Sequence, residues 1–167
     1  MKLAQKYQAL LQDAERRHIP NVDSMRVCFQ TLSLATAIDR ECADQLAPHG
    51  LSEGRFVLLF LLDAAKNGLA PNVLAQQAGV KRATITGLLD GLEREGLIER
   101  QLDSHDRRGV LIVLTSKGKQ LAKTVVNQHS HWIAGIFGTL STTEQKQLST
   151  LLDLVAQALP RSNESKP

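Results

Sequence analysis

Apolar residues recur at steps of three and four along most of this chain, and glycine or proline interrupts the pattern at intervals. Such steps place side chains on one face of an α-helix, so the pattern predicts amphipathic helices. The predicted helices cover residues 1–18, 23–46, 53–66, 71–78, 82–95, 116–137 and 142–159. Two short segments, 97–101 and 110–114, instead predict strands of a hairpin with a polar tip at 102–109. The expected fold is mainly α with one small β-ribbon.

Residues 71–115 contain two helices, a tight turn and the hairpin in direct succession. Pro71 suits the first position of a helix, and Gly79 and Gly96 stand just past predicted helix ends, where glycine commonly stops a helix. The apolar stripe of the second helix consists of Ile85, Leu88, Leu89 and Leu92. This succession predicts a winged helix-turn-helix, in which the second helix enters the DNA major groove and the ribbon is the wing.

The face of the second helix opposite its apolar stripe is small and hydroxylated, and two cations precede it. These predicted DNA contacts are Lys81, Arg82, Ala83, Thr84, Thr86 and Gly87. Threonine hydroxyls hydrogen-bond base edges or phosphates, and threonine methyls can meet a thymine methyl. A glycine inside a helix costs roughly 0.5–1 kcal/mol relative to alanine, so Gly87 indicates a close approach of another backbone. The alternative is a small-residue face packed on another helix, and the following wing favours DNA.

The hairpin tip carries two adjacent arginines, Arg107 and Arg108, beside Asp106. A guanidinium at the end of a narrow ribbon can reach a phosphate row or enter a narrow minor groove, where the potential is most negative. Asp106 can orient one guanidinium through a charge-assisted bidentate contact. A solvated charged turn is the alternative, because most charged runs are solvated.

The spacing of the wing residues resembles a known signature. Asp106-x-Arg108, five further residues and then Leu114-Thr115 match the D-x-R-x-x-x-x-x-L-T wing pattern of the MarR (multiple antibiotic resistance regulator) family. The preceding LLDGLEREGLIER and the following TSKGKQLA are also similar to that family. The resemblance extends over about residues 25–160 and is densest over 72–120.

The resemblance implies a sequence-specific transcriptional regulator, acting as a ligand-responsive repressor, that binds a pseudo-palindromic site in double-stranded DNA as a homodimer. It implies a single domain, residues 1–167, in which 1–50 and 116–160 supply the dimerisation helices. Residues 52–115 then form the winged helix-turn-helix, named here the DNA-reading lobe. Apolar stripes in the N- and C-terminal segments fit an obligate dimer, because a lone amphipathic helix is marginal in water. A winged-helix protein-interaction module with no DNA role is the alternative, and the wing arginines argue against it.

Two helical segments carry further packing predictions. Residues 23–46 present a seam suited to a helix–helix interface, made of Met25, Cys28, Leu32, Ala35, Asp39, Cys42 and Leu46. Residues 56–62 are apolar on every side, so their helix is expected to be buried within the subunit. We interpret Cys28 as a buried seam residue.

Cys28 also has a functional alternative. Val27-Cys28-Phe29 is similar to the start of the organic-hydroperoxide-sensing branch of the family, which implies a thiol-responsive repressor. The tyrosines that steady the sensing thiolate in that branch correspond here to Leu32 and Cys42, and only Arg26 supplies local positive charge. The resemblance separately implies a pocket for a small aromatic acid or phenol, and His49 and Arg55 are candidates to face such an anion.

Composition narrows the class of protein. Hydrophobic residues at 43% and charged residues at 22% describe an ordinary globule, and a net charge of only +3 means that DNA binding depends on local basic clusters. Aromatics at 4% argue against a platform that stacks RNA bases. Two cysteines do not make a disulfide framework, no charged-then-apolar leader opens the chain, and the longest apolar run is too short to span a bilayer. We therefore expect a cytoplasmic protein without membrane contact.

No sequence motif predicts catalysis, a metal or a cofactor. His129 and His131 are two residues apart, so on a helix they diverge rather than converge on a metal. The chain lacks a phosphate-cradling glycine loop, a nucleophile elbow and a His-Glu-x-x-His motif. The sequence therefore predicts a protein that is not an enzyme.

Overall fold

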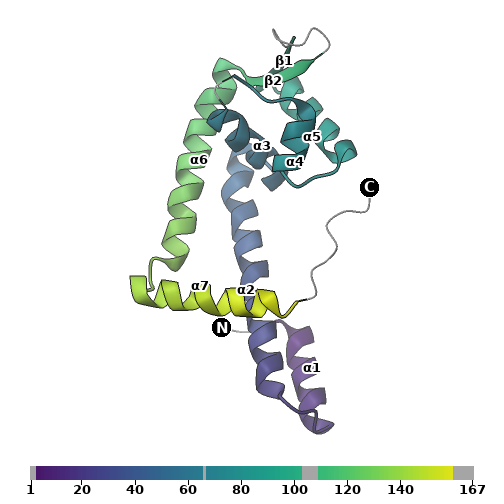
Figure 1. Cartoon of the computed structure of the whole chain (residues 1–167), viewed down its shortest axis with the longest axis vertical. Helices are drawn as coiled ribbons and strands as arrows, with labels where there is room; N and C mark the ends of the chain where they lie inside the picture. Colours follow the sequence, from purple (N-terminus) through teal and green to yellow (C-terminus); the bar gives the residue numbers. More distant parts are fainter. Residues whose placement is uncertain (1–2, 66, 103–108, 160–167) are drawn as a thin grey trace. The chain divides into compact units, whose positions relative to one another are not determined.

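The computed structural model describes residues 3–65, 67–102 and 109–159 (Figure 1). The chain forms two compact units, Met1–Val126 and Asn127–Pro167. Within the first unit the elements are α1 (Gln5–Arg16), α2 (Val22–Leu46), η1 (Ala47–His49), α3 (Glu53–Ala64), α4 (Pro71–Gln77), α5 (Arg82–Arg94), β1 (Ile98–Leu102) and β2 (Val110–Leu114). α6 (Ser116–Phe137) runs from the first unit into the second, which also contains α7 (Thr142–Gln157). The predicted fold class, mainly α with a small β-wing, is confirmed.

Glycine ends both helices of the predicted helix-turn-helix. Gly79 has φ +65° and Gly96 has φ +67°, the left-handed conformation that glycine adopts without steric cost. After α5, the Gly96 N–H donates to the Glu93 carbonyl at 2.9 Å and the Leu97 N–H donates to the Leu92 carbonyl at 2.9 Å. This pair of bonds is a Schellman motif, with the apolar residues at its two ends both buried. Local sequence therefore fixes where the second helix stops and where the hairpin begins.

Hydroxyl side chains begin three of the helices. Ser52 accepts from the Arg55 N–H ahead of α3, and Thr115 accepts from the Gly118 N–H at 3.0 Å ahead of α6. Ser141 and Glu144 form the reciprocal capping box at the start of α7. Each oxygen satisfies a backbone donor that has no partner inside its own helix.

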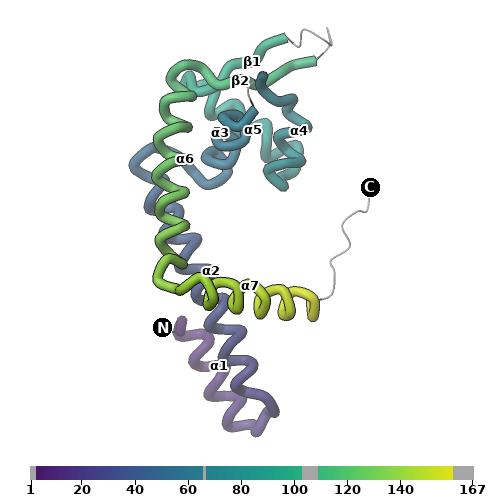
Figure 2. The backbone as a smooth tube through the Cα atoms, turned by 60° about the vertical axis from the view of Figure 1, so that its left-hand side comes forward, coloured from purple at the N-terminus to yellow at the C-terminus, as the bar shows by residue number. Residues whose placement is uncertain are grey.

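The core of the first unit lies where α3, α4, α5 and the hairpin meet, and the end of α2 and the first half of α6 add side chains to it (Figure 2). Its most deeply buried large side chains are Leu46, Leu58, Leu59, Leu74, Leu92, Ile98, Ile112 and Val125. β1 and β2 pair antiparallel from Ile98 opposite Leu114 to Leu102 opposite Val110. Leu69 adds a bridge to Ile112 on the other side of β2, with N···O distances of 2.9 and 3.0 Å. The core thus holds the hairpin against the second helix of the helix-turn-helix.

Two burial predictions are wrong for the single chain. Phe60 lies within the run predicted to be buried on every side, yet it is 47% exposed, because α3 turns one face away from the core. Cys28 is exposed rather than buried, since α2 packs only part of its length against other elements of the described chain. The predicted strand 97–101 is also displaced by one residue, to Ile98–Leu102.

The second unit leaves most of its apolar side chains exposed. α7 has no buried residue, and its exposed large hydrophobic residues, together with those of the end of α6, are Ile133, Phe137, Leu151, Leu152, Leu154 and Val155. The helical stripe predicted for this segment therefore exists, but the described chain does not cover it.

Candidate nucleic-acid interface

The predicted DNA-contacting residues lie together on the N-terminal half of α5. Lys81 precedes the helix and the other five follow in its first two turns, and all six are exposed. Behind them, Ile85 and Leu89 are 3% and 2% exposed and anchor the helix in the core. No helix of the described chain packs on this face, because all six residues are exposed; the prediction that they contact DNA stays a prediction.

Thr86 and Gly87 give this face its hydrogen-bonding capacity and its shallow profile. The Thr86 hydroxyl donates to the Arg82 carbonyl at 3.1 Å, so in this rotamer its oxygen is available as an acceptor. An acceptor at this position suits the exocyclic amine of adenine or cytosine in the major groove. A Cβ built on Gly87 would meet no atom within 4 Å, so packing inside the chain does not require glycine there.

The start of α5 is open and electropositive. Lys81 occupies the N-cap position with extended backbone, and no side chain caps the helix. The first turn contains no acidic residue, so the helix dipole, Lys81 and Arg82 all favour a negative charge at this end. A phosphate group is the anion that such a helix start commonly binds.

The C-terminal half of α5 is held by an arginine of the wing. Arg100 in β1 places Nη2 2.5 Å from Asp90 Oδ1 and Nε 3.1 Å from Glu93 Oε2. All three side chains are about half exposed, so these ion pairs add little to the stability of the fold. The sequence pattern does not predict this link, because it joins a strand to a helix ten residues earlier through packing.

A second arginine, Arg55 of α3, holds the same end of the helix. Its Nη1 lies 2.6 Å from Glu95 Oε1 and 3.4 Å from the Gly50 carbonyl oxygen. A Cβ added to Gly91 would lie 2.3 Å from Arg55 Nη2, so the guanidinium occupies the space over that glycine. Arg55 therefore has partners within the chain. Its predicted role toward a ligand anion, like that of the half-buried His49, stays a prediction.

The start of α6 is joined to the end of α5. Lys117 Nζ donates to the Glu95 carbonyl at 2.8 Å, and the Thr115 hydroxyl donates to the Gly96 carbonyl at 2.7 Å. An ammonium group at the C-terminal end of α5 is favourable for that helix, although it stands in the first turn of α6. A Cβ on Gly118 would lie 1.9 Å from the Leu97 carbonyl oxygen, so only glycine permits this approach.

The predicted wing-tip residues Asp106, Arg107 and Arg108 lie outside the described residues. The strands that carry them are described on both sides, up to Leu102 and from Val110. Val110 and Leu102 are exposed, so the hairpin extends beyond the core toward its tip.

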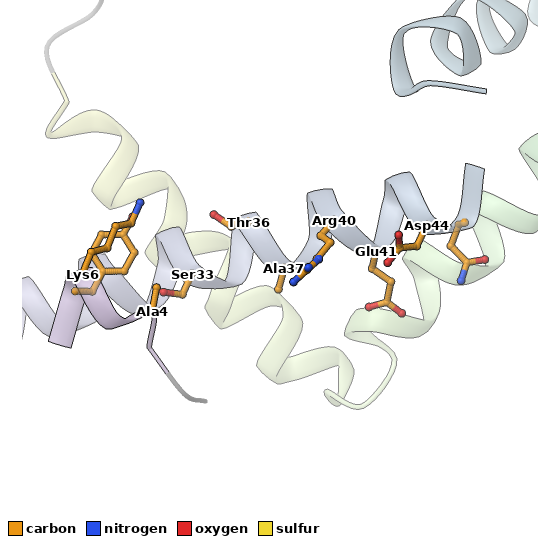
Figure 3. A pocket seen from close by; sticks show the side chains of 10 residues that line it. Ala4, Lys6, Ser33, Thr36, Ala37, Arg40, Glu41 and Asp44 are labelled. Atoms are coloured by element: carbon orange, nitrogen blue, oxygen red, sulfur yellow. The ribbon is translucent and has the colours of Figure 1, made fainter. Parts of the chain in front are cut away.

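A groove of about 670 Å³ lies between α1 and α2 (Figure 3). Lys6, Arg40, Glu41 and Asp44 give its lining both signs of charge. Neither His49 nor Arg55 belongs to that lining, so the structure does not bring the two ligand candidates to this groove. The Ser33 hydroxyl beside the groove is buried without a hydrogen-bond partner among the described residues.

Among the described residues, the cysteines and histidines form neither a reactive-thiol site nor a metal site. Burial raises the pKa of the Cys42 thiol, and the carboxylates of Glu53 and Asp39 raise it further, so Cys42 is held in its protonated form. Arg26, the cation nearest to Cys28 in sequence, pairs with Glu15 at 3.0 Å. Across the described ranges, no group of three or more His, Cys, Asp or Glu residues is arranged to hold a metal ion. In the same part of the chain, no helix combines the length and the hydropathy needed to cross a membrane.

Sequence comparison gives the chain clear relatives. A model of the MarR family matches residues 49–109. Over 153 residues the chain is 31% identical to the HTH-type transcriptional repressor YetL of Bacillus subtilis (strain 168). That match covers 91% of this chain and 92% of YetL, so it extends well beyond the DNA-reading lobe.

Structural comparison finds the same fold in regulators of known structure. The MepR–DNA complex of Staphylococcus aureus aligns with a TM-score of 0.68 and 23% identity, over 79% of this chain and 97% of that one. CouR of Rhodococcus jostii RHA1, bound to p-coumaroyl-CoA, aligns with a TM-score of 0.66 and 26% identity, over 78% of this chain and 91% of CouR. The likeness to MepR shows the fold alone, a winged helix-turn-helix with flanking helices.

Proposed function

This chain belongs to the MarR family and is a DNA-binding transcriptional regulator, and from that premise we propose that it binds a pseudo-palindromic DNA site as a homodimer. Each protomer inserts α5 into the major groove and directs its wing to the adjacent minor groove. The complex represses transcription, and a small aromatic or phenolic ligand lowers its affinity for DNA.

The observation that carries the proposal is the uncovered N-terminal face of α5. Side chains of two threonines and two cations lie exposed there, while the opposite face of the same helix is buried. Lys81 and Arg82 at the open helix start suit backbone phosphates, which position a protein on the duplex. Thr84 and Thr86 are placed one turn further in, where a helix in the major groove meets base edges.

The exposed apolar residues of the terminal helices support the homodimer. Val27 on α2 is 60% exposed, and Leu151 and Val155 on α7 are 60% and 63% exposed. Burying apolar surface is worth roughly 25 cal/mol per Å², so such helices associate when a matching surface is present. A second copy supplies the same surface by symmetry, and two-fold symmetry matches a pseudo-palindromic site.

The ligand response rests on the relatives and on simple linkage. YetL is named a repressor, and CouR was crystallised with an aromatic acyl-CoA. A ligand that prefers the dimer with misplaced recognition helices shifts the population away from the DNA-competent state. We assign neither His49 nor Arg55 a contact with the effector, so the proposed effector is defined only by its aromatic or phenolic class.

DNA binding is tested with duplexes that the wild-type protein selects from a random library. Arg108→Ala should weaken binding to the selected duplex by about 1–3 kcal/mol, because a minor-groove guanidinium is lost. The slope of log affinity against log salt should fall by about one, since one fewer cation displaces counterions. Fluorescence anisotropy at several salt concentrations measures both quantities.

Asp106→Ala serves as the matched variant of the wing tip. It should lose less affinity than Arg108→Ala, because the arginine keeps its charge and loses only its orienting carboxylate. If a folded Arg108→Ala protein keeps the wild-type affinity and the wild-type salt slope, the wing tip does not contact DNA. If the wild-type protein selects no duplex at all, the winged helix serves protein interaction instead.

A further inference from the structure

Arg55 contacts three separate parts of the chain with one guanidinium group. Its Nη1 lies 2.6 Å from Glu95 Oε1 at the end of α5 and 3.4 Å from the Gly50 carbonyl oxygen, ahead of α3. Its Nη2 lies over Gly91 in the body of α5. The side chain is 23% exposed and Glu95 is 44% exposed, so the pair is only partly screened by solvent. One residue of α3 thus joins the end of the η1 turn to the second helix of the helix-turn-helix.

Gly91 is the counterpart of Arg55 on α5. It is buried in the helix, where glycine costs roughly 0.5–1 kcal/mol relative to alanine. Its backbone is not in the left-handed region, so no turn requires glycine at this position. What glycine provides is room, because a Cβ would lie 2.3 Å from Nη2 and 3.1 Å from the Cζ of Arg55. The helix therefore accommodates the guanidinium at the expense of helical propensity.

We infer that Arg55 is a positioning residue for DNA recognition, which sets the tilt of α5 against α3 through Gly91 and Glu95. The inference rests on the proposed DNA binding by the N-terminal face of α5. Arg100 holds the same end of the helix from the wing side, through Asp90 and Glu93. Two arginines from two elements thus fix the C-terminal half of α5, and no residue of the described chain covers the outward face of the N-terminal half, which is proposed to meet DNA.

The length of the helix turns a small change at Arg55 into a large one at the DNA. Gly91 and Thr84 are about 10 Å apart along the axis at a rise of roughly 1.5 Å per residue. A tilt of about 10° around the anchored end moves the base-contacting side chains by about 2 Å. Hydrogen bonds to base edges tolerate only a few tenths of an ångström, so this displacement breaks them. Contacts to phosphates through long cationic side chains adapt more easily.

The first experiment removes the ion pair from either side. Arg55→Gln and Glu95→Gln should each weaken binding to the wild-type-selected duplex roughly 2- to 30-fold, the range for residues that modulate a site without touching its ligand. The double variant should lose no more than either single variant, since both remove one interaction. Because Arg55 does not meet phosphate, the salt slope should stay at the wild-type value. Arg55→Lys should restore little, because a point charge lacks the planar fork.

Gly91→Ala tests the same geometry without removing a charge. The added methyl displaces the guanidinium from Glu95 while alanine favours the helix, so operator affinity should fall although the melting temperature does not. In the Arg55→Gln background, where the shorter side chain leaves the space empty, Gly91→Ala should cause no further loss. A merely stabilising role for Arg55 would not produce this dependence.

Arg26→Gln is the matched control, because Arg26 and Glu15 form another Arg–Glu pair between two helices, at 3.0 Å. It should leave affinity and salt slope unchanged. Full operator affinity in folded Arg55→Gln and Gly91→Ala proteins would overturn the inference while leaving the proposed function intact. A lower salt slope in Arg55→Gln would overturn it differently, by making Arg55 a phosphate contact. A wild-type protein that selects no duplex refutes the proposed function and this inference together.

Discussion

Leucines of the DNA-reading lobe and leucines of α7 lie in opposite environments. Leu74 and Leu92 are 0% exposed, whereas Leu151 is 60% exposed and Leu154 is 58% exposed. The two segments have similar helical patterns in sequence, so the pattern alone does not distinguish them. The lobe completes its core with residues of one chain, and α7 presents a stripe that the described chain leaves uncovered. Apolar periodicity indicates which face will be buried, but not which chain buries it.

The largest expected effect comes from the buried side of this comparison. Leu92→Ala should lower the free energy of unfolding by about 2–5 kcal/mol, through lost burial and the cavity left behind. Leu102→Ala, at a leucine of the same lobe that is 79% exposed, should change it by less than about 0.5 kcal/mol. Urea denaturation followed by circular dichroism measures both. Equal losses in the two variants would contradict a core that contains Leu92 and excludes Leu102.

The exposed side of the comparison predicts an effect on assembly. Leu152→Asp should raise the dimer dissociation constant roughly a hundredfold, about 2.7 kcal/mol, because a charge enters an apolar interface. Leu102→Asp places the same charge on an exposed leucine of the wing and should leave assembly unchanged. Sedimentation equilibrium at micromolar concentration compares the two. A wild-type protein that sediments as a stable folded monomer would contradict the proposed homodimer.

A third prediction concerns the exposed polar face at the N-terminal half of α5. Thr86→Val keeps the shape and removes the hydroxyl acceptor, so discrimination among operator variants should fall by about 1–3 kcal/mol while non-specific binding changes little. Thr124→Val on α6 removes a hydroxyl that makes the same bond to the carbonyl four residues earlier and serves as the control. Equal weakening on every sequence would reassign Thr86 to phosphate contact.

The smallest expected effect is at the start of α7. Ser141→Ala should cost about 0.5–2 kcal/mol, because the backbone N–H of Glu144 loses its acceptor. Ser149→Ala, an exposed serine in the middle of the same helix, should cost little. Thermal melts monitored by circular dichroism compare the two variants, and an equal loss in Ser149→Ala would contradict a capping effect.

The same cap gives a pH dependence. Hydrogen bonds from the Ser141 hydroxyl and backbone N–H hold the pKa of Glu144 below its usual value. The ionised carboxylate therefore stabilises the fold above the pH at which a free glutamate titrates, and this contribution is lost as pH falls through the lowered pKa. The difference between wild type and Ser141→Ala should shrink on acidification. A difference that grew at acid pH would show that Glu144 does not act through this cap.

The elements and their ends were largely predictable because their signals are local. Gly79 and Gly96 stop helices through their own backbone freedom, and Ser141 caps α7 by accepting from the N–H of Glu144, three residues later. The outward face of α5 followed from helical periodicity, and its exposure agrees with that prediction. The wing arginines, in contrast, remain predictions drawn from spacing.

The ion pairs of Arg55 and Arg100 with α5 were not predictable from the sequence. Arg55 and Glu95 are 40 residues apart, and neither differs in sequence from an ordinary surface charge. Arg100 lies in a segment assigned correctly as a strand, but its partners depend on the packing of that strand against α5. The exposures of Phe60 and Cys28 were missed for a related reason, since an apolar pattern carries no information about the edge of the packed region.

The ion pairs from Arg100 to Asp90 and Glu93 link strand β1 of the hairpin directly to α5. They oppose movement of the hairpin relative to that helix. In the proposed complex, the distance between the bases that α5 contacts and those that the hairpin contacts is then set by the protein rather than by the duplex. A base pair inserted inside a half-site moves the bases beyond it by about 3.4 Å, and a hairpin linked to α5 does not follow that movement. In the proposed homodimer, a base pair inserted between the half-sites strains different contacts, those between the two protomers. The rules of spacing within and between half-sites therefore have separate structural origins.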